Sequence, residues 1–243
     1  MKLSFKDITN KEAGKTAIVV GLGKSAMYDI EKINHLYGKD GYVIISCNDF
    51  DLMTRMNVHY WVHANSLDTI FKNHQRYNAK NATIVYADTV DLTPQEFVHK
   101  NLTVDYLPYD QRHFNFKRCE KSAPCCNNFQ MWRPTIQEEL LAYSAFEFPY
   151  STGDTVALHM LALAILLGCK KIFITGVDLD YGNGYVNGGN IPHLKHPDLN
   201  QYLPRILKDF EIIGLSAINA DAEVFISNEN TKLKSLFNIN PIP

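Results

Sequence analysis

The feature that most constrains the fold is a series of short apolar runs, each rich in β-branched residues and bounded by turn-forming residues. Runs of this length are typical of strands that are buried on both faces of a sheet. Helical patterns lie between several of them, and strands that alternate with helices form parallel pairs joined by right-handed crossovers. The sequence therefore predicts an α/β fold, a Rossmann-like open and mostly parallel sheet flanked by helices. The expected strands are Thr16–Gly21, Tyr42–Cys47, His59–His63, Ala82–Ala87, Lys171–Gly176 and Ala222–Ser227.

The helical patterns and the chain length predict one domain. A chain of 243 residues, of which 46% are hydrophobic, can bury one large core. Residues Tyr109–Tyr150 break the alternation with aromatic residues, cysteines and prolines, and they predict a small insertion or lid. We therefore expect residues 1–243 to form a single Rossmann-like nucleotide-binding domain with 109–150 as a subregion. The expected helices are Ser25–Gly38, Ser66–Asn78, Thr135–Ala145, Asp154–Leu167 and Leu199–Ile213.

Charge and cysteine spacing exclude several classes of protein. The formal net charge of −2 gives no basic field for a nucleic-acid backbone, and five cysteines without a CxxC pair argue against structural zinc and against a disulfide scaffold. The longest apolar run, Thr155–Cys169, is too short to span a bilayer, and residues 1–15 lack the apolar core of a signal peptide. We expect a cytoplasmic protein. A place at the inner face of the membrane, peripheral membrane association and homo-oligomerisation stay open.

Ligands of open parallel sheets bind beyond the carboxyl ends of the strands, which directs attention to the loops there. The first loop, "GLGKS", places Gly21, Gly23 and Ser25 between a strand and a helix. Glycines let a backbone approach a ligand closely, and free N–H groups at a helix start suit a phosphate. A bare tight turn is the alternative. The third glycine of a dinucleotide fingerprint is absent, which disfavours NAD although Asp49 and Asp51 follow the next strand.

The other strand ends also carry polar residues. Asn48 follows the second strand and can contact a sugar or a base edge, or it can satisfy its own turn. Asn65 follows the third strand, beside Ser66, which is better explained as a helix cap. Asp178 follows the strand that ends at Gly176, and it can contact a ligand or accept the backbone hydrogen bonds that order the loop.

The loop beyond Asp178 offers two tyrosines and two histidines. Tyr181 and Tyr185 carry hydroxyls that can donate to a phosphate, or their rings can pack. His193 and His196 are candidates for a general base, and the alternative is that they are ordinary surface histidines. No complete set of metal ligands accompanies them, so we predict no metal site.

In order along the chain, four motifs resemble the bacterial lipooligosaccharide sialyltransferases of the glycosyltransferase family 42 type, and their uncharacterised relatives related to 6-hydroxymethylpterin diphosphokinase-like proteins. These motifs are "IVVGLGKS", "IISCNDF", "GDTVALHMLALAILLGCKKIFITGVDLDY" and "HLKHPDL…GLSAINA". The resemblance covers most of the chain and weakens between Ala87 and Pro149. It implies a Rossmann-like fold and transfer of a sugar from a nucleotide donor to a glycan acceptor.

The resemblance also implies roles for individual residues. Its glycine loop lies against the donor phosphate, its CN-containing strand end contacts the nucleotide, and a donor loop precedes the long apolar helix. By similarity these elements are Gly21, Gly23 and Ser25, then Asn48, and then Thr152, Gly153 and Thr155.

For the chemistry, the resemblance implies that Tyr181 and Tyr185 assist departure of the donor phosphate. It implies that His196 is the base, with His193 as the alternative. The expected mechanism is inverting and needs no metal or other cofactor. The chain departs from the family pattern where it lacks an Arg shortly before the donor loop and where its tyrosines are closer together, so the identity of the donor stays open.

Three functions follow from these observations. The leading one is a sialyltransferase-like glycosyltransferase, most consistent with a CMP-linked donor, that works in surface-glycan biosynthesis. The second is a pterin diphosphokinase-like enzyme, which would need Mg²⁺ and has Asp178 and Asp180 as the obvious acidic pair. The third is a nucleotide-binding module without catalysis.

Overall fold

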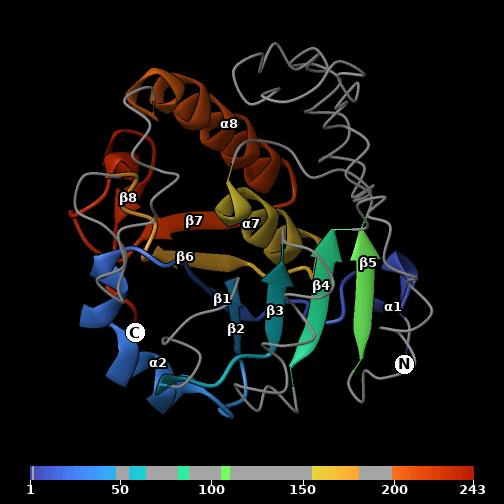
Figure 1. Cartoon of the computed structure of the whole chain (residues 1–243). Coiled ribbons are helices and arrows are strands. Elements are labelled where there is room, and N and C mark those ends of the chain that lie inside the picture. The colour runs from blue at the N-terminus through green and yellow to red at the C-terminus, as the bar shows by residue number, and fades with distance from the viewer. Residues whose placement is uncertain (2, 48–54, 64–81, 88–104, 110–154, 181–198) are drawn as a thin grey trace, which may run out of the picture.

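The computed structural model describes residues 1, 3–47, 55–63, 82–87, 105–109, 155–180 and 199–243. Its strands form one eight-stranded sheet in the order β5-β4-β3-β2-β1-β6-β7-β8, and every neighbouring pair is parallel (Figure 1). The predicted α/β fold with an open parallel sheet is confirmed. The strands are β1 (Thr16–Val20), β2 (Tyr42–Cys47), β3 (Tyr60–His63), β4 (Thr83–Ala87), β5 (Tyr106–Tyr109), β6 (Lys171–Thr175), β7 (Glu223–Ile226) and β8 (Asn238–Ile239).

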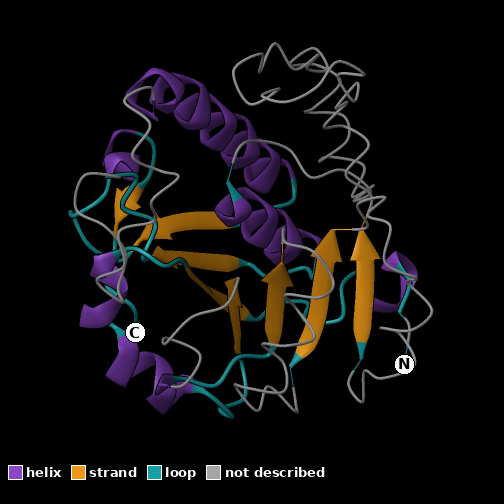
Figure 2. Ribbon diagram, viewed as in Figure 1, coloured by secondary structure: helices purple, strands orange, loops and turns teal. Residues whose placement is uncertain are grey.

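The helices cover both faces of this sheet. Figure 2 shows α7 and α8 on one face and α2 on the other. Right-handed crossovers predict this, because the β1–β2 and β6–β7 connections run in opposite directions along the sheet. The described helices are α1 (Phe5–Ile8), η1 (Lys24–Tyr28), α2 (Ile30–Leu36), α7 (Val156–Leu166), α8 (Leu199–Asn219) and η4 (Lys232–Ser235), where η marks a 3-10 helix.

The helix α7 lies at the centre of the core. It contacts β1, β2 and β3, and all of its residues after Val156 are buried, which explains why its sequence is apolar on every side. The helix ends before Gly168, whose φ of +81° is the left-handed conformation typical of a residue just after a helix. The predicted buried helix at Asp154–Leu167 is thus confirmed from Thr155 onward, and Asp154 lies outside the described residues.

Most expected elements are present, and the differences have physical causes. All six expected strands are found, while β5 and β8 were not predicted. The expected helix at Ser25–Gly38 is divided at Asp29 into η1 and α2, and α8 continues six residues beyond the predicted Ile213. The predicted helices at 66–78 and 135–145 lie outside the described residues, as does nearly all of the predicted insertion at 109–150, and these stay predictions.

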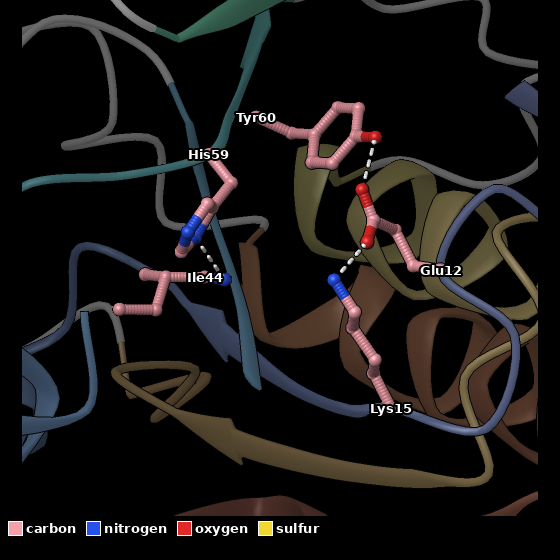
Figure 3. A network of polar contacts seen from close by, with 5 residues as sticks. All are labelled: Glu12, Lys15, Ile44, His59 and Tyr60. Atoms are coloured by element: carbon pink, nitrogen blue, oxygen red, sulfur yellow. Dashed lines mark hydrogen bonds and ion pairs between the residues drawn. The ribbon is translucent and has the colours of Figure 1, made fainter. Parts of the chain in front are cut away.

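A polar network ties the segment before β1 to the start of β3, at the amino end of the sheet (Figure 3). The Glu12 carboxylate accepts a hydrogen bond from the Tyr60 hydroxyl at 3.0 Å and pairs with the Lys15 ammonium at 2.7 Å. Nearby, Nδ1 of His59 accepts from the Ile44 N–H at 3.0 Å. Burial raises the pKa of Tyr60 and lowers the pKa of His59, so both side chains stay neutral at pH 7.

Within the described residues, no helix is both long enough and apolar enough to cross a bilayer.

Two buried histidines give the fold a testable response to acid. Burial lowers the pKa of His63 and of His159 to about 3, against 6.5 for an ordinary imidazole. The unfolded chain therefore binds more protons than the folded one once the pH falls below about 6.5. Their contribution to the free energy of unfolding is complete above that pH and is lost progressively as the pH falls toward 3.

We expect the His159→Gln variant to flatten the pH dependence of the free energy of unfolding below pH 6.5. The slope should fall by as much as ~1.4 kcal/mol per pH unit, which corresponds to one fewer proton taken up on unfolding. Urea unfolding at intervals between pH 7.5 and 4.5 measures it. The exposed His35→Gln in α2 is the control and should leave the slope unchanged. Equal slopes for His159→Gln and the wild type would contradict the prediction.

Candidate functional site

The candidate site lies where the direction of the sheet's connections reverses. The chain leaves β1 toward β2 on one side, and it later enters β6 on the other side of β1. The loops that leave the carboxyl ends of β1 and β6 therefore start side by side. This switch point is where open α/β sheets bind their ligands. The two loops here are Gly21–Ser25 and Gly176–Asp180.

Hydrogen bonds join these two loops directly. The Gly21 N–H donates to the Thr175 carbonyl at 2.8 Å, and the Gly23 N–H donates to the Gly176 carbonyl at 2.7 Å. These bonds continue the pairing of β1 with β6 beyond the ends of both strands. We call the joined segments Gly21–Ser25 and Gly176–Asp178 the clasp.

Ser25 and Asp178 complete the clasp with their side chains. The Ser25 N–H donates to Oδ2 of Asp178 at 3.1 Å, and the Ser25 hydroxyl donates to Oδ1 of the same carboxylate. The hydroxyl oxygen of Ser25 also accepts from the Gly176 N–H at 3.1 Å. Ser25 is buried, so all three of its polar contacts hold the two loops together. The loop-ordering role considered for Asp178 is therefore present in the structure.

The glycines of the clasp are required by the close approach of one backbone to another. A Cβ on Gly21 would lie 2.3 Å from the carbonyl oxygen of Gly176, and a Cβ on Gly23 would lie 2.6 Å from the carboxylate of Asp178. Gly176 has a φ of +66°, and its Cβ would lie 2.4 Å from the carbonyl oxygen of Gly21. No larger residue fits at these positions without displacing the partner loop.

The clasp also determines which N–H groups of the glycine loop remain free for a ligand. The N–H groups of Gly21, Gly23 and Ser25 all donate to protein acceptors. Across the described part of the chain, the N–H groups of Leu22 and Lys24 have no acceptor, and the Lys24 side chain is exposed. An anion held by this loop would therefore meet Leu22 and Lys24 first.

A third segment holds the β6 loop from the other side. After β7, the Thr231 hydroxyl donates to the Val177 carbonyl at 2.5 Å, and the Lys232 N–H donates to the Asp178 carbonyl at 3.1 Å. The next residue, Leu179, is buried and has a φ of +53°, which is uncommon for a bulky side chain. The loop that continues from Leu179 thus starts from a fixed point. Sequence reasoning missed Thr231, although the polar run "SNENT" after the expected strand was a signal of a strand-end loop.

Thr155 lies at the start of α7, where its hydroxyl oxygen accepts from the Ala157 N–H at 3.4 Å and so caps the helix. The C-terminal end of α7 lies at the amino end of the sheet, because the Gly14 N–H, just before β1, donates to the Gly168 carbonyl at 3.0 Å. Since α7 runs from one end of the sheet to the other, Thr155 belongs to the carboxyl end, the same end as the clasp.

Of the predicted site residues, the structure brings Gly21, Gly23, Ser25 and Asp178 into one cluster and places Thr155 at the same end of the sheet. Their contact with a nucleotide stays a prediction. The remaining predicted residues lie outside the described part of the chain, and their roles also stay predictions. They are Asn48, Asn65, Thr152, Gly153, Tyr181, Tyr185, His193 and His196.

Cys47 and Asp178 are titratable residues near these strand ends. Cys47 is the last residue of β2, and burial raises the pKa of its thiol to about 12, so it stays protonated at pH 7. Among the described residues, no group of three or more His, Cys, Asp or Glu side chains could hold a metal ion. Both carboxylate oxygens of Asp178 already accept from Ser25.

Solved structures of sialyltransferases are similar to this chain. The sialyltransferase CST-II, in complex with CMP and a trisaccharide acceptor, is 17% identical, with a TM-score of 0.50 over 93% of this chain and 86% of that chain. CstII from Campylobacter jejuni, in complex with the substrate analogue cytidine-5'-monophosphate, is 15% identical. Its TM-score is 0.49, over 94% of this chain and 86% of that chain. The apo α-2,3-sialyltransferase from Campylobacter jejuni is 17% identical, with a TM-score of 0.44 over 96% of this chain and 84% of that chain.

No family model matches the chain, and no curated protein shows a significant match to it. The structural match to CST-II spans nearly the whole chain. The chain has a sialyltransferase-type fold. The resemblance seen in the sequence motifs is therefore confirmed at the level of the fold.

We expect the Ser25→Ala variant to lower the free energy of unfolding by about 2–3 kcal/mol, because it leaves the buried Gly176 N–H without its acceptor and removes one donor to Asp178. The control is Ser216→Ala, which removes another buried hydroxyl, one that donates only to Ile212 of its own helix. Chemical denaturation of both variants measures the difference. A loss for Ser25→Ala no larger than for Ser216→Ala would contradict the importance of the clasp.

Proposed function

We propose that this protein is a glycosyltransferase that moves a sugar, sialic acid or a related one, from a CMP-linked donor to a hydroxyl of a glycan acceptor. The observation that carries the proposal is the clasp at the switch point, within a fold shared over 93% of the chain with a sialyltransferase solved in complex with CMP and a trisaccharide acceptor. We further propose that the transfer inverts the anomeric centre, needs no metal and serves the building of a surface glycan.

In this proposal the donor lies across the carboxyl ends of β1, β2 and β6. The phosphate lies over the loop Gly21–Ser25, where the exposed Lys24 supplies a positive charge and the N–H groups of Leu22 and Lys24 are free to donate. The clasp supports this role because it holds the loop in one conformation before the ligand arrives. The nucleoside and the sugar contact the other predicted residues, Asn48, Asn65, Thr152, Gly153 and Thr155.

The chemistry in this proposal belongs to the loop that follows the clasp. His196 takes the proton of the acceptor hydroxyl, the hydroxyl oxygen attacks the anomeric carbon, and the bond from that carbon to the donor phosphate breaks. Tyr181 and Tyr185 donate hydrogen bonds to the departing phosphate. Stabilising charge as it develops on the leaving group is commonly a large part of such a rate enhancement. Tyr181 lies only three residues beyond Asp178, so the clasp fixes the start of this loop.

The diphosphokinase alternative needs Asp178 and Asp180 to hold Mg²⁺. In the structure the Asp178 carboxylate accepts two hydrogen bonds from Ser25, which is the geometry of a loop-ordering residue. Mg²⁺ would have to share those oxygens or displace Ser25. The geometry therefore favours the transferase over the diphosphokinase.

We expect CMP to raise the melting temperature of the protein equally with Mg²⁺ and with EDTA. A ligand at 100 times its Kd stabilises the native state by about 2.7 kcal/mol, which for a domain of this size corresponds to a shift of roughly 5–10 °C. Thermal-shift assays with CMP, UDP, GDP, ATP and NAD measure it. A shift only with ATP and Mg²⁺ would support the diphosphokinase instead, and a shift with CMP but no turnover over a panel of donors would support the non-catalytic module.

We expect the His196→Ala variant to lose about 10²–10⁴-fold in kcat while its affinity for CMP is unchanged, because a general base acts mainly in the transition state. His193→Ala is the matched control, since it removes an imidazole three residues away in the sequence. Transfer kinetics and CMP titration on both variants measure the two effects. A large loss in His193→Ala alone would move the base to His193, and weaker CMP binding in His196→Ala would count against a base at that position.

A further inference from the structure

We propose that Asp29 is a positioning residue, which ties the segment after the glycine loop to the ends of β6 and β7 in the arrangement that the clasp needs. The expected effect of Asp29 on donor binding rests on the proposed function, whereas its expected effect on the order of the two loops does not.

Asp29 lies between η1 and α2, and it is 6% exposed. Its Oδ2 atom accepts a hydrogen bond from the Thr175 hydroxyl and another from the Ser227 hydroxyl, each at 2.7 Å. Thr175 is the last residue of β6 and Ser227 is the first residue after β7, and both are also buried. One carboxylate oxygen thus joins the segment that follows the glycine loop to the ends of two strands.

The bonds of Asp29 continue directly into the clasp. Thr175 donates its hydroxyl to Asp29 and accepts the Gly21 N–H at its carbonyl, so one residue contacts both ends of the segment that follows β1. Ser227, the other partner of Asp29, is held in turn by Asn228, whose side-chain amide donates to the Ser227 hydroxyl at 2.9 Å. The Ser227 N–H also donates to the Ile174 carbonyl of β6.

The carboxylate of Asp29 does not serve the more common purpose of an Asp at this position. Asp at the start of a helix usually accepts a hydrogen bond from an N–H of the first turn. Asp29 precedes α2, yet its side chain makes no such bond and turns instead toward the strand ends. Helix capping therefore does not explain why an acidic residue stands here.

Burial makes these bonds necessary. A buried carboxylate is costly unless hydrogen bonds or a positive charge stabilise it. No described Lys, Arg or His lies within ion-pair distance of Asp29. Its hydroxyl partners therefore stabilise the carboxylate, and the acceptor oxygen in turn fixes the side chains of Thr175 and Ser227. A site whose loops are displaced by about 1 Å loses much of its catalytic power.

The experiment measures amide hydrogen exchange in the two loops and the Kd for CMP, in the full chain. The variants are Asp29→Ala, Asp29→Asn, Thr175→Val and Ser227→Ala, with Ser216→Ala as the control. Asp29→Ala should raise exchange at least tenfold at the four hydrogen-bonded amides of the clasp, and should leave β3 and β4 unchanged. These amides are Gly21, Gly23, Ser25 and Gly176. Asn keeps an acceptor oxygen, so Asp29→Asn should restore most of the protection. CMP should bind at least tenfold more weakly to Asp29→Ala than to Ser216→Ala.

Each outcome decides the proposal. A uniform rise in exchange that includes β3 and β4, or CMP affinity equal to the wild type, would overturn it and leave Asp29 an ordinary stabilising residue. If Asp29→Ala fails to fold, Thr175→Val and Ser227→Ala each remove one of its two donors and should show the same selective loosening to a smaller extent. If loosening is selective but the wild type itself does not bind CMP, Asp29 positions the loops and the proposed function is wrong.

Discussion

The Ser25–Asp178 pair is the contact on which the rest of the site depends. It joins two loops that are 153 residues apart in the sequence, and only the parallel pairing of β1 with β6 brings them together. The carboxylate receives both the N–H and the hydroxyl of one buried serine, and that hydroxyl oxygen accepts a further N–H from Gly176. Because hydrogen bonds strengthen away from water, this partly buried set helps to hold the backbones of both loops together.

Hydrogen bonds within the protein determine which polar groups of the site remain available to a ligand. A glycine loop after a first strand is usually interpreted as a cradle for phosphate, and that interpretation assumes free N–H groups. Here Gly21 and Gly23 are glycines because the opposite loop lies against them. Their N–H groups bond to the last residue of β6 and to the first residue of that loop. The sequence predicts which loop matters, but the orientation of each N–H depends on a partner that is distant in the chain.

In other parts of the fold, too, some features follow from the local sequence and others depend on contacts with residues distant in the chain. The six expected strands are apolar runs whose burial could be predicted locally, whereas β5 contains Pro108 and β8 has two residues, so neither has a strand pattern of its own. The break between η1 and α2 occurs at Asp29, whose partners are Thr175 and Ser227. No pattern near residue 29 could indicate it.

Leu179 shows how these distant partners combine. A left-handed conformation at a non-glycine residue costs roughly 1–2 kcal/mol, and it persists only where the surroundings fix the chain on both sides. The clasp fixes Asp178 from the β1 side, and Thr231 and Lys232 fix Val177 and Asp178 from the β7 side. The segment after β7 carries none of the predicted ligand residues, yet it helps to fix Val177 and Asp178, just before the chain continues toward Tyr181. Changes in that segment should therefore alter the site as much as changes in the glycine loop do.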